Sequence, residues 1–285
     1  MRLLIGGDSE IGAATFRVLR ERGEPVAATT RRPDRVAPDR PFLDLSHPLE
    51  DWTPPPGTRG ACIFAAVARL AACENDPAGS AHVNVTQTAV LIERLIAHGV
   101  AVVFASSDKV FDGTRPQMPA DAPVAPNCEY GRQKAAVEAL LRAHIERGAD
   151  AAILRLSKVV APGSALFAAW IAALRAGRPV RAFTDLMFAP VPIALVVDAV
   201  AALLRSRARG IFQLSGPRDI SYSEAAHYLA RRLGADESLI EDMSVRDGGQ
   251  PPGAAAPFTS LDSSALRERY GMVVPDAGEV LGRML

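Results

Sequence analysis

The stretch RLLIGGDSEIGAATFRVLRERG, residues 2–23, decides the fold. It opens with RLLI, an apolar run that has the length of a short buried strand. The turn GGDSEIG follows, and then a segment whose apolar residues recur at helical spacing until Gly23 ends it. A strand, a glycine-containing turn and a helix in immediate succession predict the first unit of a parallel sheet covered by helices.

Further apolar runs alternate with longer amphipathic segments along the chain. They are PVAATT (25–30), GACIFAAV (60–67), VAVVFASS (100–107), AAILRLSKVV (151–160) and a final GIFQLSG (210–216). Strands that are apolar throughout are buried on both faces, as in a parallel sheet with helices on each side. The predicted fold class is therefore α/β, with a doubly wound parallel sheet.

The strand–helix alternation loosens after Ala161, which predicts two units. Residues 1–160 form a nucleotide-binding domain, and residues 191–216 return to it. Residues 161–190 and 217–285 form a smaller C-terminal lobe. The proline-rich stretches within residues 51–57 and 115–127 are predicted surface loops, because the alternation resumes after each.

Composition excludes several classes of function. Of 285 residues, 48% are hydrophobic and 22% charged, and the formal net charge is +0, so we expect no nucleic-acid or membrane partner. Three cysteines fit a reducing compartment, and no apolar stretch approaches the roughly 20 residues of a membrane span, which favours a cytoplasmic protein. The five histidines are scattered, so no metal site is predicted.

The turn IGGDSEIG places a nucleotide-binding pattern before the first predicted helix. Gly6 and Gly12 hold the first and last places of G-x-x-G-x-x-G, and Ser9 holds the middle one, where its hydroxyl can donate to a phosphate. A dinucleotide's pyrophosphate binds at such a helix N-terminus, the alternative being a tight turn that needs glycine, and the position directly after the first strand favours the nucleotide site. The cofactor-binding residues expected here are Gly6, Asp8, Ser9, Glu10, Ile11 and Gly12.

The second predicted strand ends in AATTRRPD, with Arg31 and Arg32 directly after it. At this place an acid selects NAD through the ribose 2′-hydroxyl, whereas an arginine accommodates the 2′-phosphate of NADP. The first acid, Asp34, comes only after a proline. We therefore expect NADP(H) to be preferred and NAD(H) to be possible, the alternative being a solvated arginine pair on a loop.

A serine, a tyrosine and a lysine compose the predicted reaction site. Ser106, Ser107 and Asp108 end a buried strand, at the sheet edge where ligands bind. Tyr130 begins YGRQK, and a spacing of four places Lys134 on the same helical face. We expect Ser107 to polarise a substrate carbonyl and Tyr130 to transfer the proton. Lys134 is expected to lower the tyrosine pKa and to hold the nicotinamide ribose.

With these motifs in place, the chain resembles the extended short-chain dehydrogenases/reductases, and most closely the dTDP-4-dehydrorhamnose reductase branch. SSDKVFDG resembles that branch's S-T-D-Y-V-F-x-G, and YGRQKAAVEALL resembles its Y-G-x-S-K-x-x-x-E segment. The likeness extends over nearly the whole chain. It implies a Rossmann-like fold and an NADPH-dependent reductase of a 4-keto (deoxy)sugar nucleotide, whose substrate binds in the C-terminal lobe. It also implies a possible homodimer formed through the helix that carries Tyr130.

The resemblance assigns further residues to the cofactor and the substrate. Relatives contact adenine where this chain has Asp44 and Leu45, and their alanines line the cofactor at Ala65, Ala66 and Ala68. Asn84 matches an asparagine that supports the proton relay. Ser107, Asp108 and Lys109 would face the substrate.

Departures from the family pattern separate the possible activities. Lys109 stands where sugar-nucleotide 4,6-dehydratases have a glutamate base, and no cysteine follows Ser107 as it does in GDP-fucose-synthase-like epimerases. Two alternatives remain open. One is a sugar-nucleotide epimerase. The other, favoured by Ser9 and Lys109, is a non-catalytic NAD(P)-binding regulatory protein, like the regulatory subunit of methionine adenosyltransferase.

Glu138 is expected to pair with Arg142 on the helix surface and to take no part in the chemistry.

Overall fold

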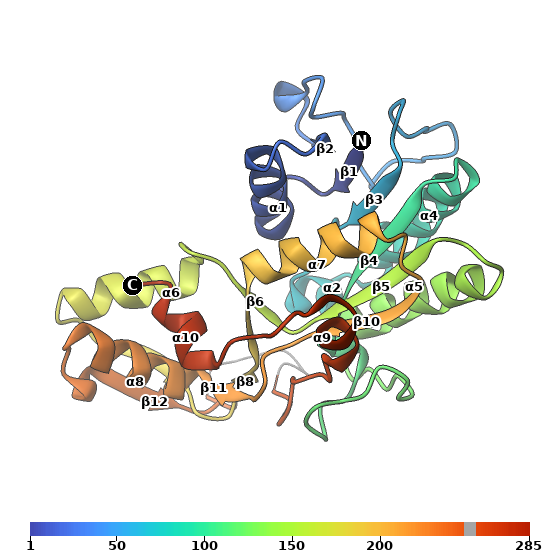
Figure 1. The fold of residues 1–285 in the computed structure, drawn as a ribbon. Helices are drawn as coiled ribbons and strands as arrows, with labels where there is room; N and C mark the ends of the chain where they lie inside the picture. Colours follow the sequence, from blue (N-terminus) through green and yellow to red (C-terminus); the bar gives the residue numbers. More distant parts are fainter. Residues whose placement is uncertain (248–254) are drawn as a thin grey trace.

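A six-stranded parallel sheet forms the centre of the molecule (Figure 1). The structure is a computed structural model that describes residues 1–247 and 255–285. The strands lie in the order β10-β5-β4-β3-β1-β2, so the chain direction across the sheet reverses beside β1, where doubly wound sheets bind ligands. Their bounds are β1 (Arg2–Ile5), β2 (Val26–Ala28), β3 (Gly60–Ile63), β4 (Ala101–Ser107), β5 (Ala151–Leu156) and β10 (Gly210–Leu214).

Helices cover both faces of this sheet. On one face lie α1 (Glu10–Glu21) and α7 (Ile193–Arg205), and on the other lie α4 (Thr88–Ala97) and α5 (Glu129–Glu146). Leu3 and Leu4 are neighbours in β1, yet they enter different cores because successive strand side chains point to opposite faces. This double burial explains why the runs are apolar throughout, and the predicted α/β Rossmann-like fold is confirmed.

The run at residues 151–160 differs from the single strand expected. The chain leaves the central sheet after Leu156, and β6 (Lys158–Val160) pairs instead with β9 (Pro190–Pro192). Ser157 lies where the chain passes from the central sheet to the pairing with β9. Its backbone N–H donates to the Leu214 carbonyl of β10 (3.2 Å), and its hydroxyl donates to the Ala189 carbonyl, just before β9 (2.6 Å). Lys158 therefore lies just beyond the carboxyl end of β5.

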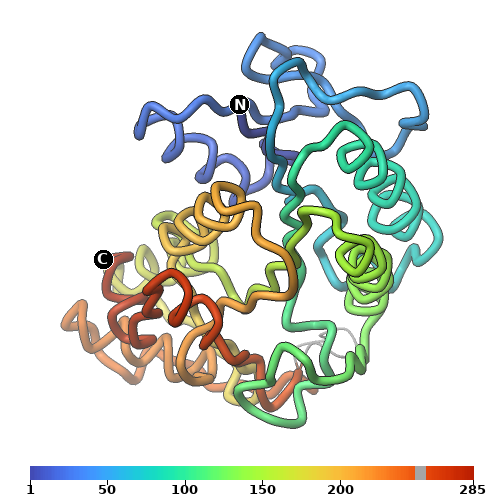
Figure 2. Tube along the Cα trace, turned by 45° about the vertical axis from the view of Figure 1, so that its right-hand side comes forward, coloured from blue at the N-terminus to red at the C-terminus, as the bar shows by residue number. Residues whose placement is uncertain are grey.

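A second hydrophobic core lies beside the carboxyl end of the sheet, where Figure 2 shows the orange-to-red C-terminal segments gathered next to the yellow-green ones. It is built by α6 (Ala165–Arg175), α8 (Tyr222–Leu233) and α10 (Ala277–Gly282), with two small strand pairs. These pairs join β7 (Val180–Phe183) to β12 (Ile240–Met243) and β8 (Met187–Phe188) to β11 (Ile220–Ser221).

The remaining α-helices of the described residues are short. They are α2 (Leu70–Asn75), α3 (Pro77–Ala81) and α9 (Ser264–Tyr270). Leu266 of α9 packs into the core of the central sheet, although residues 217–285 are expected in the smaller lobe. The division into two domains therefore stays a prediction, and the boundary drawn from the sequence does not follow the packing at α9.

Candidate active site

The loop between β1 and α1 leaves room for a close backbone approach. Gly6 has φ +92°, and a Cβ on it would lie 2.6 Å from the Ala65 backbone nitrogen. A Cβ on Gly12 would lie 2.2 Å from the Gly6 carbonyl oxygen. Both positions therefore need glycine, one for its backbone conformation and one for the contact between helix and loop. β1 ends at Ile5 and α1 begins at Glu10, so the loop places the N-terminus of α1 at the end of β1, as a pyrophosphate site requires.

Ser9 does not have the role expected from its sequence position. Its hydroxyl donates to the Gly6 carbonyl (2.7 Å) and accepts from the Gly12 N–H (3.0 Å), so it caps α1. A hydroxyl has one hydrogen to donate, and here that hydrogen is already used. In this arrangement Ser9 shapes the loop and does not donate to a phosphate.

Asp8 lies at the outer end of the same loop and is held as an anion. It accepts hydrogen bonds from the Thr30 hydroxyl (2.8 Å) and from the Arg40 guanidinium (2.9 Å). Burial raises the pKa of Asp8, but these bonds, with the Arg31 backbone N–H and the charges of Arg40 and Arg32, hold it below its usual range. Asp8 thus fixes the segment that carries the two arginines.

A cavity of about 310 Å³ beside this loop collects most of the residues expected to bind adenosine. Arg31 and Arg32 are exposed on its rim, and neither guanidinium has an ion-pair partner within residues 1–247 and 255–285. Burial raises the pKa of Asp44, but two hydrogen bonds from Ser46 and the nearby His47 and Arg31 lower it overall. The predicted residues lining this cavity are Gly6, Asp8, Ser9, Arg31, Arg32, Asp44, Leu45, Ala65 and Ala66.

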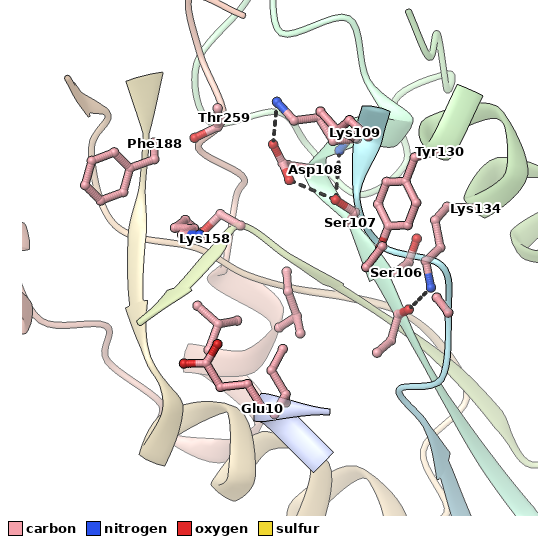
Figure 3. A pocket seen from close by; sticks show the side chains of 18 of the residues that line it. Glu10, Ser106, Ser107, Asp108, Lys109, Tyr130, Lys134, Lys158, Phe188 and Thr259 are labelled. Carbon is pink, nitrogen blue, oxygen red and sulfur yellow. Dashed lines mark hydrogen bonds and ion pairs between the residues drawn. The ribbon is translucent and has the colours of Figure 1, made fainter. Parts of the chain in front are cut away.

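A larger cavity of about 530 Å³ holds the predicted reaction site (Figure 3). It shares Ser9 and Ala66 with the smaller cavity, so the two form one groove of the kind that a dinucleotide needs. The predicted residues lining it also include Glu10, Ile11, Ala68, Ser107, Asp108, Lys109, Tyr130 and Lys134. Of the predicted cofactor residues, Gly12 and Asn84 line neither cavity.

The backbone brings Tyr130 beside the end of β4. A Cβ on Gly131 would lie 2.0 Å from the Lys109 carbonyl oxygen, so the first turn of α5 packs directly on the segment after β4. Ser107, Tyr130 and Lys134 consequently face the same cavity, as Figure 3 shows. Tyr130 and Lys134 lie on one face of α5 because they are four residues apart, and Ser107 joins them because β4 ends beside the first turn of α5.

The Ser107 hydroxyl has partners within the protein. It donates to the Asp108 carboxylate (2.9 Å) and accepts from the Lys109 N–H (3.2 Å). The Lys109 ammonium lies 3.5 Å from the same carboxylate, and all three residues line the cavity. A substrate carbonyl therefore has to compete with Asp108 for the hydrogen of Ser107.

The pKa of Tyr130 moves opposite to the expected direction. Burial raises it well above its usual range, and the Asp108 carboxylate adds to the rise. The Lys134 ammonium does not reverse this, because it donates to the Ala105 carbonyl (2.8 Å) and lies 5.6 Å from the centre of the tyrosine ring. Tyr130 therefore stays protonated at neutral pH, which is the form that can give a proton to a carbonyl oxygen.

Lys134 is itself weakly basic. Burial lowers its pKa to about 8, although the Glu138 carboxylate raises it in part. The side chain is 4% exposed and its ammonium lies 4.4 Å from the centre of the Phe104 ring. A small change in its surroundings is thus enough to change the charge of Lys134 near neutral pH.

Asn84 supports the site from a distance and does not reach Lys134. Its amide accepts from the Val67 N–H (2.7 Å) and donates to the Val67 carbonyl (3.0 Å). It also donates to Gln133 (2.7 Å), one residue before Lys134. Asn84 thereby ties the alanine-rich loop after β3 to α5, which positions two walls of the groove.

Glu138 does not lie on the helix surface, where the sequence predicts it. The side chain is buried, 1% exposed, and both carboxylate oxygens pair with the Arg155 guanidinium, at 2.9 and 2.7 Å. Arg142 lies farther away, at 3.8 Å. Ser106 donates to Glu138 (2.6 Å), so the pair holds the residue next to Ser107. An arginine inside the apolar run AAILRL was the available signal, because a buried charge needs a partner.

Arg155 extends this contact toward the proline-rich loop. It is fully buried, and its guanidinium donates to the Ala120 carbonyl (3.0 Å) and to Gln213 (3.2 Å). Gln213 in turn donates to the carbonyls of Met118 (2.8 Å) and Asp262 (3.1 Å). One buried polar network therefore joins β4, α5, β5, β10 and two loops.

The wall of the cavity opposite Tyr130 was also missed. It consists of Lys158, Phe188, Tyr222 and Thr259 with their neighbours, from segments far apart in the sequence. Asp219 fixes Thr259 by accepting from its backbone N–H (2.6 Å) and its hydroxyl (2.9 Å). No local pattern links these positions, so only the fold brings them together.

Two classes of feature do not occur in the part of the chain that the structure describes. Residues 1–247 and 255–285 contain no cluster of three or more His, Cys, Asp or Glu side chains that could hold a metal ion. The same residues form no helix with both the length and the apolar content that a membrane crossing requires.

Comparisons with known proteins agree with this fold. A family model described as RmlD substrate binding domain matches residues 1–285. No curated protein matches the sequence. Among solved structures, a dTDP-4-dehydrorhamnose reductase from Clostridium acetobutylicum matches with a TM-score of 0.85 at 18% identity, covering 100% of this chain and 98% of that one.

Two further structures carry nicotinamide cofactors. A dTDP-4-dehydrorhamnose reductase from Bacillus anthracis in complex with NADP has a TM-score of 0.82 at 17% identity, covering 99% of this chain and 96% of its own. A UDP-glucose 4-epimerase from Thermus thermophilus in complex with NAD has a TM-score of 0.81 at 22% identity, with the same coverages of 99% and 96%. At these identities the likeness shows the fold.

Proposed function

The chain belongs to the RmlD substrate binding domain family, and on this premise we propose that it is an NADPH-dependent reductase of a 4-keto (deoxy)sugar nucleotide. In coarser terms, it is an NAD(P)-dependent oxidoreductase of the extended short-chain dehydrogenase/reductase type, among the enzymes that act on sugar nucleotides. The reduction of a 4-keto sugar nucleotide is supported by one observation. Ser107, Tyr130 and Lys134 line the same cavity, and this cavity continues into the dinucleotide groove.

The residues present fit a nicotinamide dinucleotide. Side chains at Gly6 or Gly12 would fill the space at the start of α1, and the two cavities meet at Ser9 and Ala66. The adenosine end would lie beside Asp44 and the pyrophosphate at the N-terminus of α1. When bound, the cofactor supplies the hydride for reduction of a carbonyl.

The protein supplies the proton and the alignment. Tyr130, kept protonated by burial, donates its hydrogen to the carbonyl oxygen of the substrate. Ser107 orients that oxygen once its hydroxyl turns from Asp108 toward the substrate. Lys134, fixed on the Ala105 carbonyl, holds positive charge beneath the tyrosine ring and toward the ribose.

A preference for NADPH is the second part of the proposal. Arg31 and Arg32 stand on the rim of the adenosine cavity without an acidic ion-pair partner among the described residues. The acid nearest in the loop, Asp8, is already occupied by Arg40 and Thr30. A 2′-phosphate would thus meet a guanidinium without first displacing an ion pair.

One observation favours the regulatory alternative. The Ser107 hydroxyl is bonded to Asp108, which in turn contacts Lys109, so a neighbouring anion competes with the substrate for the serine. In a protein that only binds the cofactor, this arrangement would have no consequence.

The test is oxidation of NADPH by the purified protein with a panel of 4-keto sugar nucleotides, dTDP- and UDP-linked. We expect turnover with at least one of them and the corresponding hydroxyl product. Because Lys109 stands in place of a dehydratase base, incubation with dTDP-glucose should yield no 4-keto-6-deoxy product. NADPH binding without turnover on any member would favour the regulatory reading, and a 4-keto-6-deoxy product would favour elimination chemistry.

A further inference from the structure

The wall of the main cavity opposite Tyr130 carries two polar groups without partners. The Lys158 ammonium has no hydrogen-bond acceptor and no carboxylate within 4.0 Å among residues 1–247 and 255–285, and residues 248–254 contain no Asp or Glu. The Tyr222 hydroxyl likewise makes no hydrogen bond to any residue that the structure describes. By contrast, Lys109 and Lys134 in the same cavity both have acceptors, Asp108 and the Ala105 carbonyl.

The backbone that carries Lys158 is fixed. Lys158 opens β6 in parallel register with Pro190 of β9, directly after the bond between the Ser157 hydroxyl and the Ala189 carbonyl. The side chain itself is exposed to the cavity. A cation on a fixed backbone, open to a cavity and free of an internal counter-charge, is suited to an anionic ligand.

The surroundings of this cation favour a ligand that is also partly aromatic or sugar-like. In Figure 3, Lys158 lies between Phe188 and Thr259 on one side and Glu10 on the other, across the cavity from Tyr130. The Phe188 and Tyr222 rings lie 4.5 Å apart between centroids. Burial, with a contribution from the Asp108 carboxylate, raises the pKa of Tyr222 to about 12, so its hydroxyl is a neutral donor at physiological pH.

The charges around the cavity indicate which anionic group would bind Lys158. Lys158 is the one charged residue that the wall from Leu156 to Val159, Leu186 to Phe188, Tyr222 and Thr259 contributes among the described residues. The cofactor's pyrophosphate already has the N-terminus of α1, where the first turn carries the acid Glu10. Because the cofactor pyrophosphate binds at α1, it does not neutralise Lys158, which lies on the wall opposite Tyr130. Lys158 is therefore available to a second anion.

We propose that Lys158, with the Tyr222 hydroxyl of the same wall, binds the diphosphate of the sugar nucleotide and so directs the sugar toward Ser107 and Tyr130. This inference rests on the proposed function, and it assigns the anion-binding residues of the substrate half of that site. A lysine contacts a phosphate as a compact charge, and a tyrosine adds one neutral hydrogen bond.

The experiment measures binding by calorimetry, with nucleoside diphosphates (dTDP, UDP, GDP and CDP) as probes and NADP⁺ held at saturation. Lys158→Met should weaken binding of the preferred diphosphate by ~10–100-fold, as expected for loss of a charge-assisted contact, and Tyr222→Phe by ~2–10-fold. Lys158→Arg should retain most of the affinity. Arg178→Met, an exposed cation that lines neither the reaction cavity nor the adenosine cavity, is the matched control and should change nothing.

Three results would overturn the inference. If Lys158→Met weakens NADP⁺ binding and spares the diphosphates, the cation serves the cofactor. If it weakens an unphosphorylated nucleoside as much as the diphosphate, the change acts on the wall and not on an anion. If the diphosphate affinity is unchanged while the parent binds well, Lys158 has no part in binding. A parent that binds no nucleoside diphosphate at all contradicts the proposed function itself.

Discussion

Replacing Glu138 by Gln should destabilise the protein severely. The variant keeps the shape of the side chain but leaves the fully buried Arg155 guanidinium without a counter-charge. Two charge-assisted contacts, at 2.9 and 2.7 Å, are lost or weakened, and the new amide N–H₂ faces other donors. Breaking one side of a buried ion pair costs about 3–5 kcal/mol, which is a large share of the ~5–15 kcal/mol that folds a typical domain.

The assay is urea unfolding followed by circular dichroism, with Arg142→Ala as the matched control. Arg142 also faces Glu138, but at 3.8 Å and with a side chain that is 39% exposed. Its removal should therefore cost at most ~1 kcal/mol. A Glu138→Gln variant as stable as the Arg142→Ala variant would refute the reasoning that the Arg155 pair, and not the surface pair, carries the stability.

The remaining predictions concern the groove. Tyr130→Phe should leave the NADPH dissociation constant unchanged and lower turnover by ~10²–10⁴, measured at saturating NADPH with the best 4-keto sugar nucleotide; full activity would exclude Tyr130 as proton donor. Arg31→Ala should weaken NADPH by ~1.5–3 kcal/mol and leave NADH unchanged in fluorescence titrations, an outcome that equal parent affinities for the two cofactors would contradict. The Lys134 pKa is lowered from 10.5 to about 8, so its charge is present below pH 8 and lost above it. NADPH affinity should accordingly fall as pH rises through about 8, and Lys134→Arg should remove that dependence, because guanidinium stays protonated.

Much of the fold could be predicted because its signals are local. Each strand of the central sheet is a short apolar run, and the loop at Gly6 and the helix at Tyr130 carry motifs whose spacing alone places them at the sheet edge. The end of β5 was missed because Lys158–Val160 is as apolar, apart from its lysine, as the strand before it. Only the bonds of Ser157 to Leu214 and Ala189 show where the chain changes partner.

The parts of the site that sequence reasoning missed depend on long-range contacts. Glu138 and Arg155 are 17 residues apart and meet only because α5 packs on β5. The direction of the Tyr130 pKa depends on burial and on Asp108, and a spacing of four to Lys134 contains neither. The wall formed by Lys158, Tyr222 and Thr259 joins three distant segments, none of which has a recognisable pattern of its own.

The hydrogen bonds that tie Ser157 to Ala189, Ala189 to Thr259 and Thr259 to Asp219 have a consequence for how ligands enter. They run without a break from the end of the central sheet across the opposite wall of the cavity. They therefore tie the wall opposite Tyr130 to the end of the central sheet, and we expect the distance between that wall and the sheet to change little when a ligand enters. Selection among sugars would then come from the width of a gap that is fixed before the ligand arrives, and crystals grown with and without ligand should superimpose as a single rigid body.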